Sequence, residues 1–134
     1  MPAPPVASAT MALEVNRPDV VAEVTTAFDA YEAALVANDV DALDAFFWDS
    51  PEVVRFGVAD RQQGAGEIAA FRRRAGAPPP RSLENTVVTT FGPDVAVVTT
   101  EFRTPGDPRV GRQSQTWVRL DDGWRVVSAH VSIV

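Results

Sequence analysis

Hydrophobic residues recur at spacings of three and four along residues 16–39, which is the period of an amphipathic α-helix. The apolar stripe of this segment consists of Val20, Val24, Phe28, Tyr31 and Leu35. A proline at position 18 suits a first helical turn, and the Asn-Asp pair at 38–39 is typical of a helix end. We therefore predict a helix here, with the only tyrosine of the chain on its buried face.

Two shorter helices are predicted after it. The first begins near Asp39 or Asp41, directs Leu43 and its two following phenylalanines to the core, and ends at the Asp-Ser-Pro sequence of 49–51. The second covers residues 64–76, "GAGEIAAFRRRAG", and places Arg72 on the same side as Ile68. Arg72 therefore lies on an apolar stripe, where a surface arginine is not expected.

Four strand-like runs make up the second half of the chain, at 82–91, 95–104, 110–120 and 124–134, and hairpin-length turns join them. Helices followed by an antiparallel meander predict an α+β fold. We expect a cone in which three helices pack on a strongly curved, mixed or antiparallel sheet that encloses a pocket. Residues 16–134 would form this single domain, and residues 1–15 a disordered or extended tail.

Alternation with period two assigns faces within the last strands. On the final strand one face would carry Trp124, Val126, Ser128, His130 and Ser132. On the strand before it, Gln115 and Trp117 share a face with Gln113. The alternation alone leaves open which face lines the pocket.

Arg55 interrupts an otherwise apolar strand, "PEVVRFGV" at 51–58. One interpretation is a cation that reaches solvent or pairs with Asp49, Glu52 or Asp60. The other is a buried guanidinium that binds a substrate carboxylate through two parallel hydrogen bonds. Asp60 is also a candidate site residue, because it is close to Arg55 in sequence.

Composition narrows the possible chemistry. All twelve basic residues are arginine and cysteine is absent, so Schiff-base and thiolate nucleophiles are excluded within this chain. One histidine cannot build the usual zinc site. A net charge of −6 argues against nucleic acid and anionic membranes as partners. The absence of cysteine favours a reducing, cytoplasmic location.

Tyr31 and His130 are thus the remaining candidates for proton transfer, together with the carboxylates. A buried tyrosine is by default a core residue with one hydrogen-bond partner. Beside Arg55, however, the pKa of its phenol would fall, and Tyr31 could act as an acid or base. His130 is more commonly a structural histidine in such a strand, and Ser132 on the same face could bind a ligand or a neighbouring strand.

Several segments resemble the AtzH-like family, which includes the HpxZ-type proteins of oxalurate catabolism. The most specific are the run "YEAAL…ND…FFW.SP..VRFG" and the later "GRQSQTWVR…GWR…AHVS". The resemblance extends from about Asn16 to Ser132. It implies the cone fold of the nuclear-transport-factor-two-like (SnoaL-like) superfamily, a homodimer formed through the sheet, and no metal or organic cofactor.

The resemblance also implies an activity, the decarboxylating amidohydrolysis of 1,3-dicarboxyurea to allophanate. The catalytic tyrosine and arginine of the family fall on Tyr31 and Arg55. The segment "DRQQG" at 60–64 departs from the family pattern, so the pocket rim and the substrate would differ.

The leading hypothesis is therefore a metal-independent hydrolase of an N-carboxylated or oxalyl-substituted urea. Secondary ligands of the substrate would be Arg72, Gln115, Trp117, His130, Ser132 and Asp60. The alternative is a non-catalytic module of the same fold that binds a small carboxylated metabolite or supports an amidase partner. An isomerase of the ketosteroid type is disfavoured, since no acidic residue lies clearly on an inward stripe.

Overall fold

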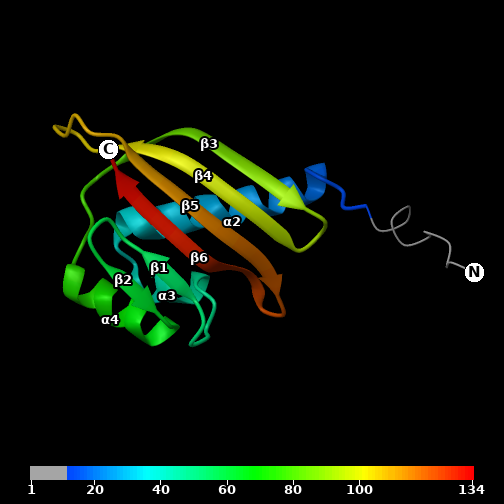
Figure 1. Cartoon of the computed structure of the whole chain (residues 1–134), viewed down its shortest axis with the longest axis horizontal. Helices are drawn as coiled ribbons and strands as arrows, with labels where there is room; N and C mark the ends of the chain where they lie inside the picture. Colours follow the sequence, from blue (N-terminus) through cyan, green and yellow to red (C-terminus); the bar gives the residue numbers. More distant parts are fainter. Residues whose placement is uncertain (1–11) are drawn as a thin grey trace, which may run out of the picture.

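The computed structural model describes residues 12–134, which form three helices and one six-stranded sheet (Figure 1). The helices are α2 (Pro18–Ala37), α3 (Val40–Phe46) and α4 (Ala65–Ala75). The strands are β1 (Val54–Phe56), β2 (Arg61–Gln63), β3 (Ser82–Phe91), β4 (Val95–Arg103), β5 (Gly111–Leu120) and β6 (Gly123–Ile133). The predicted α+β fold is confirmed. Most of the predicted tail, residues 1–11, lies outside the described residues.

The sheet is mixed, with the strand order β2-β1-β6-β5-β4-β3. β1 runs parallel to β6, and every other neighbouring pair is antiparallel. In Figure 1 the sheet lies in front of α2, so the helix covers the face turned away from the viewer. We call the face toward α2 the inner face and the opposite one the outer face.

Local sequence explains the bounds of α2. Pro18 occupies the first turn, and Asn38 ends the helix in the left-handed conformation, with its N–H bonded to the carbonyl oxygens of Ala34 and Leu35. The predicted apolar stripe is buried at Val20, Val24, Phe28 and Tyr31. Within residues 12–134, no helix is both long enough and apolar enough to span a bilayer.

β6 contains one extra residue relative to β5. Thr116 pairs with Ser128 but Trp117 pairs with Val126, so Val127 forms a β-bulge. A bulge of this kind reverses the alternation of every residue that follows it on the strand. Trp124 and Val126 are buried before the bulge, whereas after it the buried residue is Ala129 and His130 is exposed. The uninterrupted alternation expected for residues 124–132 is therefore wrong.

β1 and β2 form a short antiparallel pair that the hydrophobic pattern did not predict as such. Arg55 is directly opposite Gln62 in this pair and next to Ala129 of β6 on the other side. β1 is only three residues long, but it lies between β2 and β6, and its pairing with both strands fixes the direction of the Arg55 side chain.

Candidate active site

A cavity lies between α2, α4 and the inner face of the sheet. A larger part of about 350 Å³ and a smaller part of about 110 Å³ adjoin there. Both parts are lined by Tyr31, Leu35, Arg55 and Pro78. The structure therefore brings the two leading candidates, Tyr31 and Arg55, into one enclosed site.

Three aromatic rings hold the ring of Tyr31. Phe46 and Trp117 contact it edge to face, at centroid distances of 5.9 and 6.1 Å, and Phe47 lies 6.2 Å away at an intermediate tilt. The Tyr31 hydroxyl makes no hydrogen bond to another described residue. The ring is therefore fixed by packing, while its hydroxyl is left for a ligand in the cavity.

The protonation of Tyr31 differs from the sequence-based expectation. Burial raises the pKa of its phenol above the ordinary value of 10.0, and this outweighs the lowering effects of Arg72, Arg81 and Arg55. The expectation that Arg55 would lower the pKa of Tyr31 overall is therefore wrong. Tyr31 is neutral at pH 7, in the form that donates a proton or a hydrogen bond.

Arg55 pairs with an acidic residue and also keeps hydrogen-bond donors for a ligand, so both interpretations of its position hold in part. Its Nη1 donates to Asp60 Oδ1 and to Gln62 Oε1, each at 2.9 Å, and its guanidinium carbon lies 5.1 Å from the centre of the Phe71 ring. Its Nε and Nη2 have no partner among the described residues. One edge of the guanidinium is thus anchored by Asp60, and the remaining donors are available to a carboxylate in the cavity.

Asp60 is a positioning residue for Arg55 rather than a lining residue of the cavity. Its Oδ1 also accepts a hydrogen bond of 2.8 Å from Gln62 Nε2, which closes a three-residue network. The carboxylate lies against Gly57, where a Cβ atom would overlap it. A side chain at position 57 would therefore displace the Asp60 carboxylate from this position.

Arg72 also lines the smaller part of the cavity, as the sequence suggested. Its Nη1 donates to Asp44 Oδ1 at 2.8 Å, and its guanidinium lies 5.0 Å from the ring centre of Phe47. The other carboxylate oxygen of Asp44 accepts from Arg73 at 2.8 Å. Asp44 of α3 thus holds Arg72 of α4 beside the tyrosine.

A third arginine, Arg81, was missed in the sequence analysis. It forms a buried ion pair with Glu32 of α2, and its Nη2 donates to Gln113 Oε1 at 3.1 Å. Its guanidinium lies 4.6 Å from the ring centre of Phe102. The sequence feature that could have indicated Arg81 is Glu32, because a carboxylate beside Tyr31 on a buried helical stripe implies a cationic partner.

Gln115 lines the larger part of the cavity, and Trp117 lies behind it. Trp117 is fully buried, and its Nε1 donates to Gln115 Oε1 at 3.0 Å. Of these two predicted ligands, the structure places Gln115 at the cavity and Trp117 in the core, against Tyr31.

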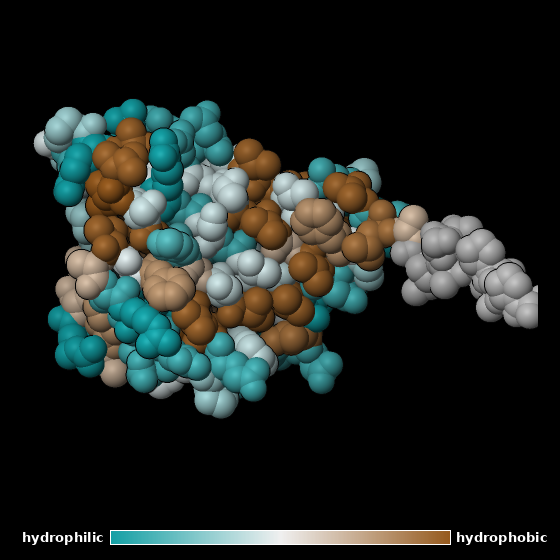
Figure 2. All heavy atoms as spheres, viewed as in Figure 1, coloured by the Kyte–Doolittle hydropathy of each residue, from teal (hydrophilic) through white to brown (hydrophobic). Residues whose placement is uncertain are grey.

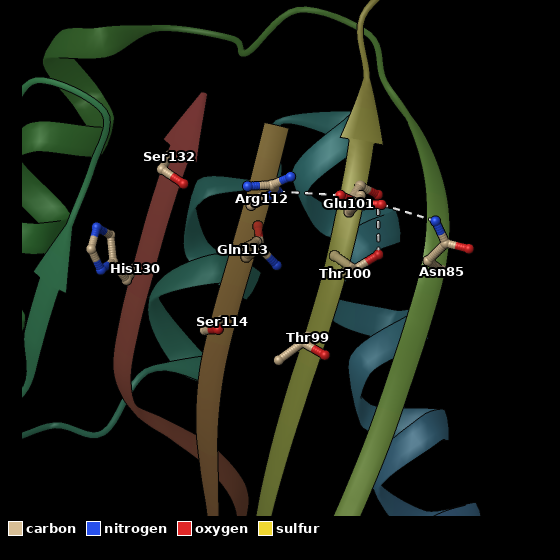
Figure 3. Close-up of a pocket in the computed structure, with 9 residues that line it drawn as sticks. All are labelled: Asn85, Thr99, Thr100, Glu101, Arg112, Gln113, Ser114, His130 and Ser132. Carbon is tan, nitrogen blue, oxygen red and sulfur yellow. Dashed lines mark hydrogen bonds and ion pairs between the residues drawn. The ribbon is translucent and has the colours of Figure 1, made fainter. Parts of the chain in front are cut away.

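His130 and Ser132 lie on the outer face, so the structure does not bring them together with Tyr31. They line a groove of about 340 Å³ with residues of β3, β4 and β5. Figure 3 shows both side chains projecting from β6 on the side of the sheet away from the helices. The bulge at Val127 is the physical cause, since without it His130 would follow Val126 on the inner face.

Solved structures share the fold of this chain. An NTF2-like protein of unknown function from Pseudomonas putida KT2440 superposes with a TM-score of 0.73 at 17% identity, over 87% of each chain. Its similarity shows the fold alone, which is that of the NTF2-like superfamily.

Two more similar structures cover almost the whole domain. A cystatin-like fold protein from Burkholderia xenovorans LB400 is 53% identical, with a TM-score of 0.89 over 91% of this chain and 97% of that one. A protein of unknown function of the DUF3225 family from Pectobacterium atrosepticum SCRI1043 is 49% identical, with a TM-score of 0.88 over 90% and 94%. No curated protein sequence matches the chain.

The model of the AtzH-like family matches residues 13–134. This protein therefore belongs to the AtzH-like family, and the resemblance found in the sequence is confirmed.

Proposed function

We propose that this protein is a metal-independent hydrolase that removes a carboxyl group from an N-carboxylated urea of the 1,3-dicarboxyurea type, or cleaves an oxalyl-substituted urea. The observation that carries the proposal is the meeting of Tyr31 and Arg55 in one cavity of an AtzH-like chain. A guanidinium with unpartnered donors suits a carboxylate, and a neutral phenol suits proton donation.

For a dicarboxyurea, the reaction breaks the bond between a carboxylate carbon and a urea nitrogen. Carbon dioxide leaves, the electron pair passes to the nitrogen and its conjugated carbonyl, and the nitrogen takes one proton. Tyr31 would donate that proton, because a urea nitrogen anion is a stronger base than a phenolate. Water then returns a proton to Tyr31, so that the substrate dianion and one proton give allophanate and carbon dioxide.

The charge change in this reaction constrains the role of Arg55. Decarboxylation converts a carboxylate into a neutral molecule, so a cation paired with that carboxylate would stabilise the substrate more than the transition state. Arg55 should instead hold the carboxylate that remains in the product, or the urea oxygen on which charge develops.

The test is to supply 1,3-dicarboxyurea and measure release of carbon dioxide and allophanate, or to supply oxalurate and measure formation of oxalate and urea. Tyr31→Phe should lower kcat about a hundredfold or more, because it removes the proton donor and keeps the ring. Arg55→Met should raise KM about tenfold or more. Arg119→Met, an exposed arginine of β5 paired with Asp94, is the matched control.

Unchanged kinetics in Tyr31→Phe and Arg55→Met would contradict the assigned roles. Ligand binding without turnover would indicate the alternative, a module that binds a carboxylated metabolite and supports an amidase. A cytoplasmic location and a functional link to an amidase belong to this proposal.

We further propose that the protein is a homodimer through the outer face of the sheet. No helix of the described residues covers this face, and it exposes apolar side chains such as Phe56 and Val87 beside the groove at His130. Figure 2 shows apolar and polar residues mixed over it, as in an interface that also carries hydrogen bonds.

A further inference from the structure

Two glutamines of β5 face the cavity across the sheet from Arg55. Arg55 of β1 pairs with Ala129 of β6, which pairs with Gln115 of β5, so the three residues lie at one level. Two inter-strand spacings separate the backbones of Arg55 and Gln115 by about 10 Å. Gln113 lies one inward position further along β5 and also lines the larger part of the cavity.

The orientation of both amides is fixed by groups that can only donate. Trp117 Nε1 donates to Gln115 Oε1 at 3.0 Å, and Arg81 Nη2 donates to Gln113 Oε1 at 3.1 Å. An indole N–H and a guanidinium cannot accept a hydrogen bond, so each must meet the carbonyl end of the amide. The NH₂ ends of both glutamines are thereby left for other partners.

The NH₂ group of Gln113 has no such partner among the described residues. Gln113 is 5% exposed, and its Nε2 is a buried nitrogen without a hydrogen bond. Buried donors are nearly always paired, and an unpaired one costs free energy. A ligand oxygen would satisfy it once the amide turns toward the cavity that Gln113 lines.

The charge at this end of the cavity is balanced. Arg81, which holds Gln113, is itself paired with Glu32 in a buried ion pair. The two glutamines offer a ligand neutral amide donors, in contrast to the guanidinium of Arg55 at the other end, and the charge of Arg81 is offset by Glu32.

We propose that the amides of Gln113 and Gln115 form a second oxyanion subsite, which binds the carboxylate of the substrate that is distal to Arg55. This inference rests on the proposed function, in which the substrate is a small urea with carboxylates at both ends. Neutral donors suit the carboxylate that leaves as carbon dioxide, because they favour its charged form less strongly than a guanidinium does. The two subsites thus orient the substrate, with Arg55 on the carboxylate that stays.

Two stable ligands of equal length test the subsite by calorimetry. Glutarate has the same number of chain atoms between its carboxylates as dicarboxyurea, and pentanoate replaces one of these carboxylates by a methyl group. The wild-type protein should bind glutarate about tenfold more tightly than pentanoate, since the second carboxylate gains hydrogen bonds to both amides.

Gln113→Glu and Gln115→Glu should each reduce this preference to about one. Each variant keeps an acceptor for Arg81 or Trp117 but replaces the N–H donors by a carboxylate oxygen. Gln63→Glu makes the same charge change on the exposed edge of β2 and should keep the preference. Gln113→Met and Gln115→Met, which add no charge, should also lose it, and they decide the result if a glutamate variant does not fold.

Equal binding of both ligands by the wild-type protein would overturn the second subsite, as would a preserved preference in the folded variants of both glutamines. Neither ligand is hydrolysed, so this result does not depend on turnover. A clear preference for glutarate together with no reaction of dicarboxyurea or oxalurate would instead overturn the proposed function and leave the subsite in place.

Discussion

Tyr31 is subject to opposing influences from its surroundings. Burial disfavours its phenolate, while Arg72, Arg81 and Arg55 favour it, and burial has the larger effect on its pKa. Each of these arginines is paired with a carboxylate, Asp44, Glu32 and Asp60 respectively, which reduces its influence on the phenol. An anionic substrate would favour the neutral phenol further.

This balance predicts an alkaline titration of Tyr31. The chain has one tyrosine, so the phenolate absorbance near 295 nm reports this residue alone. In the folded protein the half-ionisation point should lie above pH 10, and in denaturant it should return to about 10.

The same shift predicts how stability depends on pH. Because the folded pKa is raised, the contribution of Tyr31 to stability is complete below pH 10 and is lost as the pH rises through the folded value. Chemical denaturation at pH 9 and pH 11 should show a smaller loss of stability in Tyr31→Phe than in the wild type. A folded titration below pH 10 would contradict the assigned burial.

At the scale of elements, the β1–β2 pair is small but positions Arg55. The turn between its strands closes with a hydrogen bond of 2.9 Å from the N–H of Gly57 to the carbonyl oxygen of Asp60. The side chain of Asp60 then folds back over Gly57 to reach Arg55. The conformation of the turn and the anchoring of the guanidinium are therefore coupled.

Gly57→Ala should keep the turn but release the guanidinium of Arg55 from its anchor. The added methyl group overlaps the Asp60 carboxylate, which must rotate away and give up its hydrogen bonds to Arg55 and Gln62. We expect glutarate affinity to fall about tenfold, with a loss of stability of about 1–2 kcal/mol. Calorimetry and chemical denaturation measure the two effects.

Gly66→Ala is the matched control, because a Cβ there meets no atom within 4 Å and alanine is the better helix former in α4. It should keep the affinity and slightly raise the stability. Equal affinity in both alanine variants would show that Asp60 does not position Arg55.

Sequence patterns predicted the long elements well. The three helices and the four long strands each contain a strong period or a clear turn signal, and they occur close to the predicted positions. β2 was missed because Arg61, Gln62 and Gln63 are all polar, and a three-residue strand is defined by its neighbour rather than by its own pattern.

The site was predicted in part for a similar reason. Tyr31 and Arg55 stand out as polar groups on apolar elements, so the pattern identified them as candidates, and the resemblance to the AtzH-like family gave them catalytic roles. Arg81 lies 49 residues from its partner Glu32, and only the packing of α2 against the sheet brings the two together. The bulge at Val127 has no distinctive residue type, so the faces of His130 and Ser132 could not be predicted from alternation.

At the scale of the whole molecule, the two faces of the sheet differ in what covers them. α2, α3 and α4 provide the core and enclose the cavity, while the outer face keeps an open groove. If a second copy covers this groove, the protein should sediment at twice the chain mass.

A charge placed at the centre of the groove should prevent this association. Ser114 is exposed there, between Thr99 of β4 and His130 of β6. Ser114→Arg should sediment as a monomer, because an unpaired guanidinium would be buried in the interface. Ala30→Arg, on the exposed side of α2, should stay dimeric. A monomeric wild-type protein would exclude the proposed interface.

The bulge at Val127 has a consequence for how β6 could change in length. The second half of β6 presents Ala129, Val131 and Ile133 to the cavity and His130 and Ser132 to the outer face. Deletion of Val127 would leave both sets where they are, because Ala129 would still lie opposite Gln115 and His130 opposite Ser114. The bulge thus accommodates one extra residue in the strand, while the cavity wall and the surface available to a second copy stay unchanged.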